Sequence, residues 1–137
     1  MSAKDVHVVP EGGSNFAGVQ GCCEILAAGG IAPGSYDEIW LARGTGATLA
    51  GVALAAAKEM PKTQIKGVAV LKGGDFLRRD IHQHIHHENG QVLANWTLLT
   101  DYHHGGYART TKELLSFIKS FDHETTIPLD KKTTTVQ

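Results

Sequence analysis

The stretch from Tyr36 to Gly51, which reads YDEIWLARGTGATLAG, decides the fold. Within it, Ile39 to Ala42 form a short apolar run rich in strand-forming residues, and the run stops at Arg43-Gly44. The Ala- and Leu-rich segment from Ala47 to Met60 follows and predicts a helix. The stretch therefore predicts a strand, a glycine-rich turn and the start of a helix, in that order.

The turn between that strand and that helix has the features of an anion site. Its glycines can adopt backbone angles that a side chain forbids, and the first amides of a helix lack partners within the helix. Threonine hydroxyls add further donors. We expect this turn to hold the phosphate of a small cofactor, through Gly44, Thr45, Gly46, Ala47 and Thr48. Glycine-rich turns also serve as plain connectors, so that alternative stays open.

The turn resembles neither of the two common nucleotide motifs. It is not G-x-G-x-x-G, and it lacks the lysine of a P-loop, so it supports neither a dinucleotide site nor a Walker-type site.

The rest of the chain continues the alternation of strands and helices. Further strands are predicted at residues 6–9, 66–71 and 96–99, and further helices at residues 16–28, 75–87 and 110–121. Strands that are apolar on both faces predict an α/β fold, a three-layer α/β/α arrangement with a mostly parallel sheet. Trp40 and Trp96 are expected in the core. We expect one domain over residues 1–127 and a tail without fixed structure over residues 128–137.

Ligands of open parallel sheets lie beyond the carboxyl ends of the strands. Here those ends are residues 11–15, 43–48, 72–75 and 101–107, and three of the four contain a glycine pair beside polar residues. We expect them to form the walls of one site.

Composition narrows the class of protein. In 137 residues the hydrophobic content is 42%, the charged content is 20% and the formal net charge is −1, which favours neither nucleic acid nor an anionic membrane as a partner. No apolar run reaches the roughly 20 residues of a membrane helix, and no signal-peptide core is present. The adjacent Cys22 and Cys23 fit a reducing cytoplasm, and no neighbouring base marks either as catalytic.

A histidine-rich segment, IHQHIHHE from Ile81 to Glu88, is the other conspicuous motif. On a helix, His82 and His86 share one face at the spacing of metal ligands. The sequence fixes no third ligand, so we expect an exposed polar face without a specific metal. His103 and His104 fall on the expected ligand edge, where either can contact the phosphate or the substrate.

Five motifs together resemble a known family. They are VPEGGSN (9–15), RGTGATLAG (43–51), GVAVLKGG (67–74), DYHHGGYART (101–110) and TIPLD (126–130). In this order and spacing the sequence is similar to the 1-aminocyclopropane-1-carboxylate deaminase and D-cysteine desulfhydrase family. These are pyridoxal-phosphate enzymes with the fold of the tryptophan synthase β-subunit. The resemblance covers about residues 5 to 130.

The resemblance implies roles for some residues and a limit on activity. Residues 44–48 would grip the phosphate of pyridoxal phosphate, and Tyr107 would be a catalytic residue near the substrate. The Schiff-base lysine of the family lies in a segment that this sequence does not match, and Lys72 is expected to be only a solvated lysine at a strand end. The resemblance therefore implies a part of a deaminase- or desulfhydrase-like lyase that is inactive alone.

Other functions remain open. The chain is alternatively a free-standing oligomeric domain that binds a small phosphate-type ligand, or an interaction module in which the glycine turns only connect elements. A partial sheet leaves apolar surface and strand edges exposed, so the sequence predicts a homodimer.

Overall fold

The computed structural model describes residues 6–70, 74–90, 92–102 and 111–129. Within these residues three parallel strands form one sheet in the order β1-β2-β3, namely β1 (Glu38–Arg43), β2 (Gln64–Ala69) and β3 (Trp96–Leu99). Each strand is joined to the next through a helix, as parallel strands require. The predicted α/β class with a parallel sheet is confirmed.

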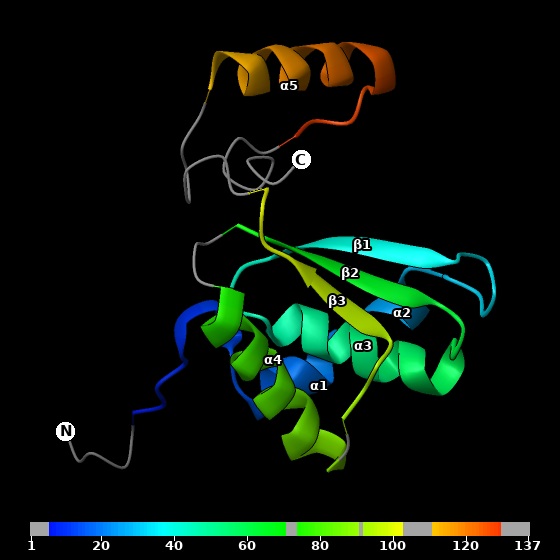
Figure 1. Ribbon diagram of the computed structural model, residues 1–137, viewed down its shortest axis with the longest axis vertical. Coiled ribbons are helices and arrows are strands. Elements are labelled where there is room, and N and C mark those ends of the chain that lie inside the picture. The colour runs from blue at the N-terminus through cyan, green and yellow to red at the C-terminus, as the bar shows by residue number, and fades with distance from the viewer. Residues whose placement is uncertain (1–5, 71–73, 91, 103–110, 130–137) are drawn as a thin grey trace.

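The helices lie on both sides of this sheet. They are α1 (Phe16–Cys22), α2 (Ile25–Ala28), α3 (Ala47–Glu59), α4 (Gly74–Asn89) and α5 (Lys112–Thr125), and a short 3-10 helix, η2, spans Glu11–Gly13. Figure 1 shows α1 to α4 below the sheet and α5 above it. The contacts between elements centre on α3, which packs against α1, α2, α4, β1 and β2.

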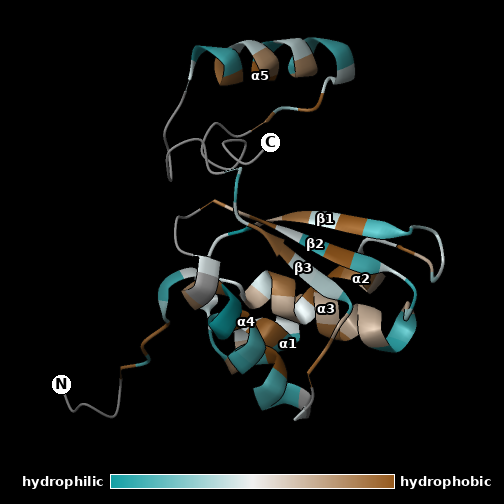
Figure 2. Ribbon diagram, viewed as in Figure 1, coloured by the Kyte–Doolittle hydropathy of each residue, from teal (hydrophilic) through white to brown (hydrophobic). Residues whose placement is uncertain are grey.

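The helix α3 is the centre of the hydrophobic core. Nine of its thirteen residues, from Ala47 to Ala56, are buried, and most of them are alanine, leucine or valine. Small side chains let neighbouring elements approach closely, and Gly67 of β2 extends this packing because a Cβ there would lie 2.6 Å from a methyl carbon of Leu49. Figure 2 shows hydrophobic residues gathered in the strands and α3, and a mostly hydrophilic α4.

The strands alternate between the two faces of the sheet. Ile39 and Leu41 of β1 pack against the core, whereas Trp40 points to the other face and is 58% exposed. The expectation that Trp40 lies in the core is therefore wrong, because the alternation of an edge strand turns it away from α3. Trp96 does pack against the core, edge-on to the His82 ring at 5.0 Å.

Two predicted elements differ from the structure. The predicted strand at residues 6–9 is absent; that segment has no regular structure, and its three valines are 63–79% exposed because no described strand pairs with it. The predicted helix at residues 16–28 divides into α1 and α2 at a turn formed by Cys23 and Glu24. Gly18 and Gly21 lower the helix propensity of α1, which accounts for its short length.

The predicted domain boundaries remain predictions. Of the expected tail, residues 130–137 lie outside the described part of the chain. Within the described residues, no helix has the length and apolar character needed to cross a membrane.

Candidate functional site

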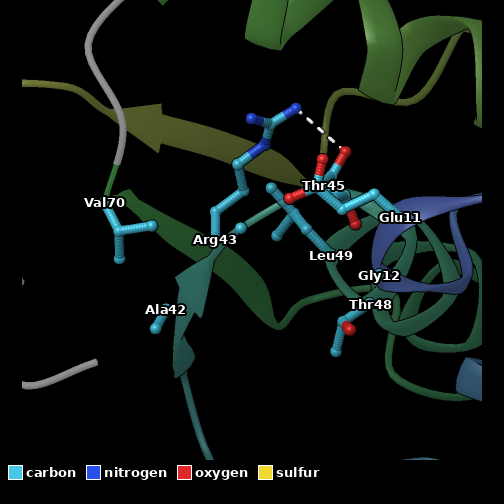
Figure 3. Close-up of a pocket in the computed structure, with 10 residues that line it drawn as sticks. Glu11, Gly12, Ala42, Arg43, Thr45, Thr48, Leu49 and Val70 are labelled. Carbon is cyan, nitrogen blue, oxygen red and sulfur yellow. Dashed lines mark hydrogen bonds between the residues drawn. The ribbon is translucent and has the colours of Figure 1, made fainter. Parts of the chain in front are cut away.

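A pocket of about 440 Å³ opens at the carboxyl end of β1. It lies at the strand-to-helix turn that the sequence singled out. Its walls also include the start of the chain and the end of β2, and the lining residues are Glu11, Gly12, Ala42, Arg43, Gly44, Thr45, Gly46, Thr48, Leu49 and Val70 (Figure 3). The turn and residues 11–12 therefore share one cavity, as the sequence predicts.

The amino-terminal end of α3 faces this cavity. Gly46 caps the helix with φ 103° and ψ −13°, a left-handed conformation that favours glycine. The ladder of backbone hydrogen bonds in α3 begins with the Ala50 amide, which donates to the Gly46 carbonyl at 3.0 Å. The amides of Ala47, Thr48 and Leu49 thus precede the ladder. Together with the helix dipole they favour an anion at this position.

Arg43 is the one charged side chain within the described residues that is buried, at 2% exposure. Its Nη2 atom donates to the carbonyl oxygens of Thr45 at 3.1 Å and Leu77 at 3.2 Å, and lies 3.6 Å from a carboxylate oxygen of Asp80. Burial lowers the pKa of Arg43 from its ordinary value, and the carboxylate of Asp80 opposes that shift. The Nε atom is buried without a hydrogen-bond partner among the described residues.

The sequence did not single out Arg43 as a functional residue. One signal for it exists: an arginine occupies the third inward position of β1, after Ile39 and Leu41. A buried charge needs polar partners. A charged side chain at an inward strand position directly before a glycine-rich turn therefore indicates polar interactions at the end of the strand.

The wall opposite Thr45 is built from the turn at residues 11–13. Gly12 has φ +64°, and a Cβ there would lie 2.6 Å from Oγ1 of Thr45. The chain then enters α1, where the Asn15 side chain accepts a hydrogen bond from the Gly18 amide at 2.8 Å and caps the helix. Glycine at position 12 therefore lets the chain pass directly against the turn between β1 and α3.

The two ends of the turn have different environments. Thr48 is exposed at the mouth of the pocket, and its hydroxyl oxygen lies 3.8 Å from Sγ of Cys22 on α1. Thr45 is partly buried between Arg43 and Gly12. Both threonines line the pocket.

Comparisons with known proteins identify relatives of this arrangement. No family model matches the chain. A putative 1-aminocyclopropane-1-carboxylate deaminase of Pyrococcus furiosus is 28% identical over 122 residues, which are 82% of this chain and 37% of that protein. The crystal structure of a 1-aminocyclopropane-1-carboxylate deaminase homologue superimposes with a TM-score of 0.73 at 25% identity, over 94% of this chain and 41% of that one.

This chain is similar to the 1-aminocyclopropane-1-carboxylate deaminases. The family resemblance stated from the five motifs is confirmed, and the α/β fold is that of the deaminase homologue. The chain spans about two fifths of the length of the deaminase relatives that it matches.

Several residues that the sequence predicts for this site fall outside the part of the chain that the structure describes. They are Tyr107, His103, His104 and Lys72. Of the four predicted walls, the structure brings together residues 11–12 and 43–48, with Val70 at the end of β2. The roles of residues 44–48 and of Tyr107 remain predictions.

The histidine-rich segment lies in α4 and has a buried side, with Ile81 and Ile85, and an exposed side. His82, Gln83, His86, His87 and Val92 line a shallow pocket, and no group of three or more metal-ligand side chains occurs within the described residues. His84 points instead toward the start of the chain, with its Nε2 atom 3.0 Å from the hydroxyl of Ser14. Burial lowers the pKa of His84 from its ordinary value. The contact between His84 and Ser14 therefore links α4 to the loop that precedes α1.

Proposed function

We propose that this domain holds the phosphate group of pyridoxal phosphate in the turn from Gly44 to Thr48. The observation that carries the proposal is the position of the pocket: it opens on the amino-terminal end of α3 and contains the buried side chain of Arg43. A helix amino-terminus beside a cationic side chain suits a phosphate group. Similarity to the deaminases supports this choice of cofactor.

The residues present fit that group. The Nε atom of Arg43 is buried without a partner among the described residues, and Gly46 lets the guanidinium approach the start of α3, because a Cβ there would lie 3.0 Å from Nη2 of Arg43. The backbone amides at the start of α3 and the Thr48 hydroxyl would donate to phosphate oxygens. Pyridoxal phosphate, when bound covalently to an amine, supplies an electron sink for deamination and lyase chemistry. By resemblance, Tyr107 would lie near the substrate.

We further propose that these 137 residues bind the cofactor phosphate without catalysing a reaction by themselves. The family resemblance places the Schiff-base lysine in a segment outside them. That lysine both fixes the cofactor and moves protons, so its loss removes orders of magnitude of rate. The domain would then act as the phosphate-binding part of a deaminase- or desulfhydrase-like lyase.

Ligand-induced stabilisation tests the binding proposal. The melting temperature of the chain is measured with inorganic phosphate, pyridoxal phosphate and pyridoxal, which lacks the phosphate. We expect the first two to raise the melting temperature and pyridoxal to leave it unchanged. In Thr48→Val we expect phosphate affinity to fall about tenfold, since a hydrogen bond to a charged group is lost. Thr97→Val, on β3 and outside the pocket, is the matched control.

Either of two results would contradict this function. The first is a wild-type chain that no phosphate compound stabilises. The second is equal affinity for pyridoxal and pyridoxal phosphate, which would mean that the phosphate group contributes nothing to binding. Borohydride reduction followed by mass measurement tests the catalytic part: covalent attachment of the cofactor to a lysine of this chain would overturn the claim of inactivity.

A second candidate function, that of a self-associating binding module, rests on the exposed face of β1. Trp40 is 58% exposed there, and its indole nitrogen donates to the carboxylate of Glu38 at 2.9 Å. A large aromatic side chain on an edge strand favours association with another sheet. We propose a homodimer that covers this face. Sedimentation should show a dimer for the wild type and a monomer for Trp40→Glu, whereas a wild-type monomer would contradict it.

A further inference from the structure

The guanidinium of Arg43 lies next to the positive end of a helix, which is an unfavourable place for a cation. A Cβ on Gly46, the capping residue of α3, would lie 3.0 Å from Nη2 and 3.3 Å from Nε of Arg43. The helix dipole and the guanidinium therefore carry the same sign at the same point. Asp80 offsets this only in part, because its side chain is 46% exposed and solvent screens the pair.

The hydrogen bonds of Arg43 fix the turn itself. Nη2 donates a hydrogen bond to the Thr45 carbonyl oxygen at 3.1 Å. Because the peptide unit between Thr45 and Gly46 is planar and trans, this bond also fixes the orientation of the Gly46 amide. The same nitrogen holds the Leu77 carbonyl of α4 at 3.2 Å, and so the turn is tied to a neighbouring helix. Gly46 makes this possible, since any side chain there would meet the guanidinium.

From these contacts we infer that Arg43 is a positioning residue for the anion site, which orients the Thr45–Gly46 peptide and adds a fixed positive charge to the phosphate pocket. The inference rests on the proposed phosphate function and deepens it. An anion bound at the start of α3 would also lie near the guanidinium and would relieve the repulsion between the two positive ends. The site thereby selects a phosphate group by its negative charge as well as by hydrogen bonding.

Two substitutions with opposite expected effects test this role. Arg43→Met keeps the length and packing of the side chain but removes the charge and its donors, and we expect phosphate affinity to fall about tenfold or more. Asp80→Asn keeps the shape of the carboxylate but removes its charge, and we expect phosphate affinity to rise by about twofold to fivefold. If the ion pair between Arg43 and Asp80 were purely structural, the phosphate affinity would change in the same direction in both variants.

The control and the rescue use the same chain. Arg78→Met is the matched control, because Arg78 also donates to a backbone carbonyl, that of Leu98 at 3.1 Å, but does not line the pocket. Arg43→Ala should regain phosphate binding when guanidinium ion is added at millimolar concentration. Circular dichroism establishes that each variant is folded. If Arg43→Met does not fold, Asp80→Asn still decides, since its side chain is half exposed.

The outcomes separate this inference from the proposed function. If the wild type binds phosphate and Thr48→Val does not, but Arg43→Met binds as tightly as the wild type, the role of Arg43 is overturned and the phosphate function stands. A fall in affinity for Asp80→Asn would also overturn the role of the charge. If the wild type binds no phosphate at all, the proposed function fails first.

Discussion

A Cβ placed on Gly51 would lie 2.5 Å from the Cβ of Cys22. Gly51 is in the middle of α3 and Cys22 ends α1. The two helices can approach this closely because glycine has no side chain at position 51. The same contact places the Cys22 sulfur 3.8 Å from the hydroxyl of Thr48, one turn earlier on α3. The contact between α1 and α3 therefore adjoins the turn for which we propose phosphate binding.

Gly51→Ala should destabilise the protein. The added methyl group would also meet the Val19 carbonyl oxygen at 2.5 Å, so α1 would have to move away from α3. We expect a loss of about 1–3 kcal/mol in the free energy of unfolding, measured by urea denaturation. Gly21→Ala in α1 is the control: no atom lies within 4 Å of the added Cβ, and alanine should raise stability by about 0.5–1 kcal/mol. Equal effects of the two changes would refute the packing argument.

Gly12 and Gly13 offer a matched pair for the wall of the pocket. Both have positive φ, +64° and +61°, so alanine at either costs about 1–2 kcal/mol of backbone strain. Only Gly12→Ala would also meet Thr45, at 2.6 Å, whereas the space at Gly13 is open. We expect a lower melting temperature for Gly12→Ala than for Gly13→Ala, because of the added clash with Thr45, and weaker phosphate binding for Gly12→Ala alone. Calorimetric titration measures the phosphate affinity of both variants. Equal affinities would contradict the claim that Gly12 forms a wall of the phosphate site.

The cap of α1 should contribute measurably to stability. Asn15→Ala removes the acceptor of the Gly18 amide, and we expect a loss of about 1 kcal/mol. Asn15→Asp keeps an acceptor in the same place and should restore most of that loss. Thermal denaturation followed by circular dichroism compares the three proteins. A full loss in Asn15→Asp would show that the cap is not the reason.

His84 should make the fold sensitive to mild acid. Burial lowers its pKa from 6.5, Arg43 and His87 act in the same direction, Asp80 opposes them, and the Ser14 hydroxyl contacts the ring. The unfolded chain therefore binds a proton more readily than the folded one at a pH just below 6.5. The stability that neutral His84 contributes is present above pH 6.5 and falls as the pH drops toward the folded pKa.

His84→Gln measures this dependence. We expect the wild type to lose more free energy of unfolding than this variant between pH 7 and pH 5.5. The exposed His123→Gln on α5 serves as the control and should follow the wild type. If the free energy of unfolding changes equally with pH in the wild type and in His84→Gln, His84 is not the cause of the acid sensitivity.

The central part of the fold is readable from sequence because local and tertiary preferences agree there. β1, α3, β2 and β3 were each predicted within a few residues of their observed bounds. The Ala- and Leu-rich composition of α3 favours a helix and also suits a buried position, and the apolar run of β2 suits a strand covered on both faces. The location of the pocket follows from the same elements, since the turn between β1 and α3 forms most of it.

The remaining differences arise where one preference acts alone. The valines at residues 6–9 have strand propensity but no described partner strand, and β propensity has little force without pairing. Trp40 is hydrophobic, yet the two-residue period of an edge strand turns it away from the core. The role of Arg43 is not evident from sequence, because its ion pair and one of its hydrogen bonds are made with Asp80 and Leu77, more than thirty residues further along the chain.

The burial of α3 also determines which parts of the site can change. All residues from Ala47 to Ala56 except Thr48 are buried, so the first amides of this helix are held by the same packing that keeps the protein folded. A shift of those donors to suit a different anion would require repacking of the whole centre. Among the lining residues that the structure describes, Glu11 and Gly12 lie outside α3, so a substitution there can widen or narrow the pocket without repacking that helix.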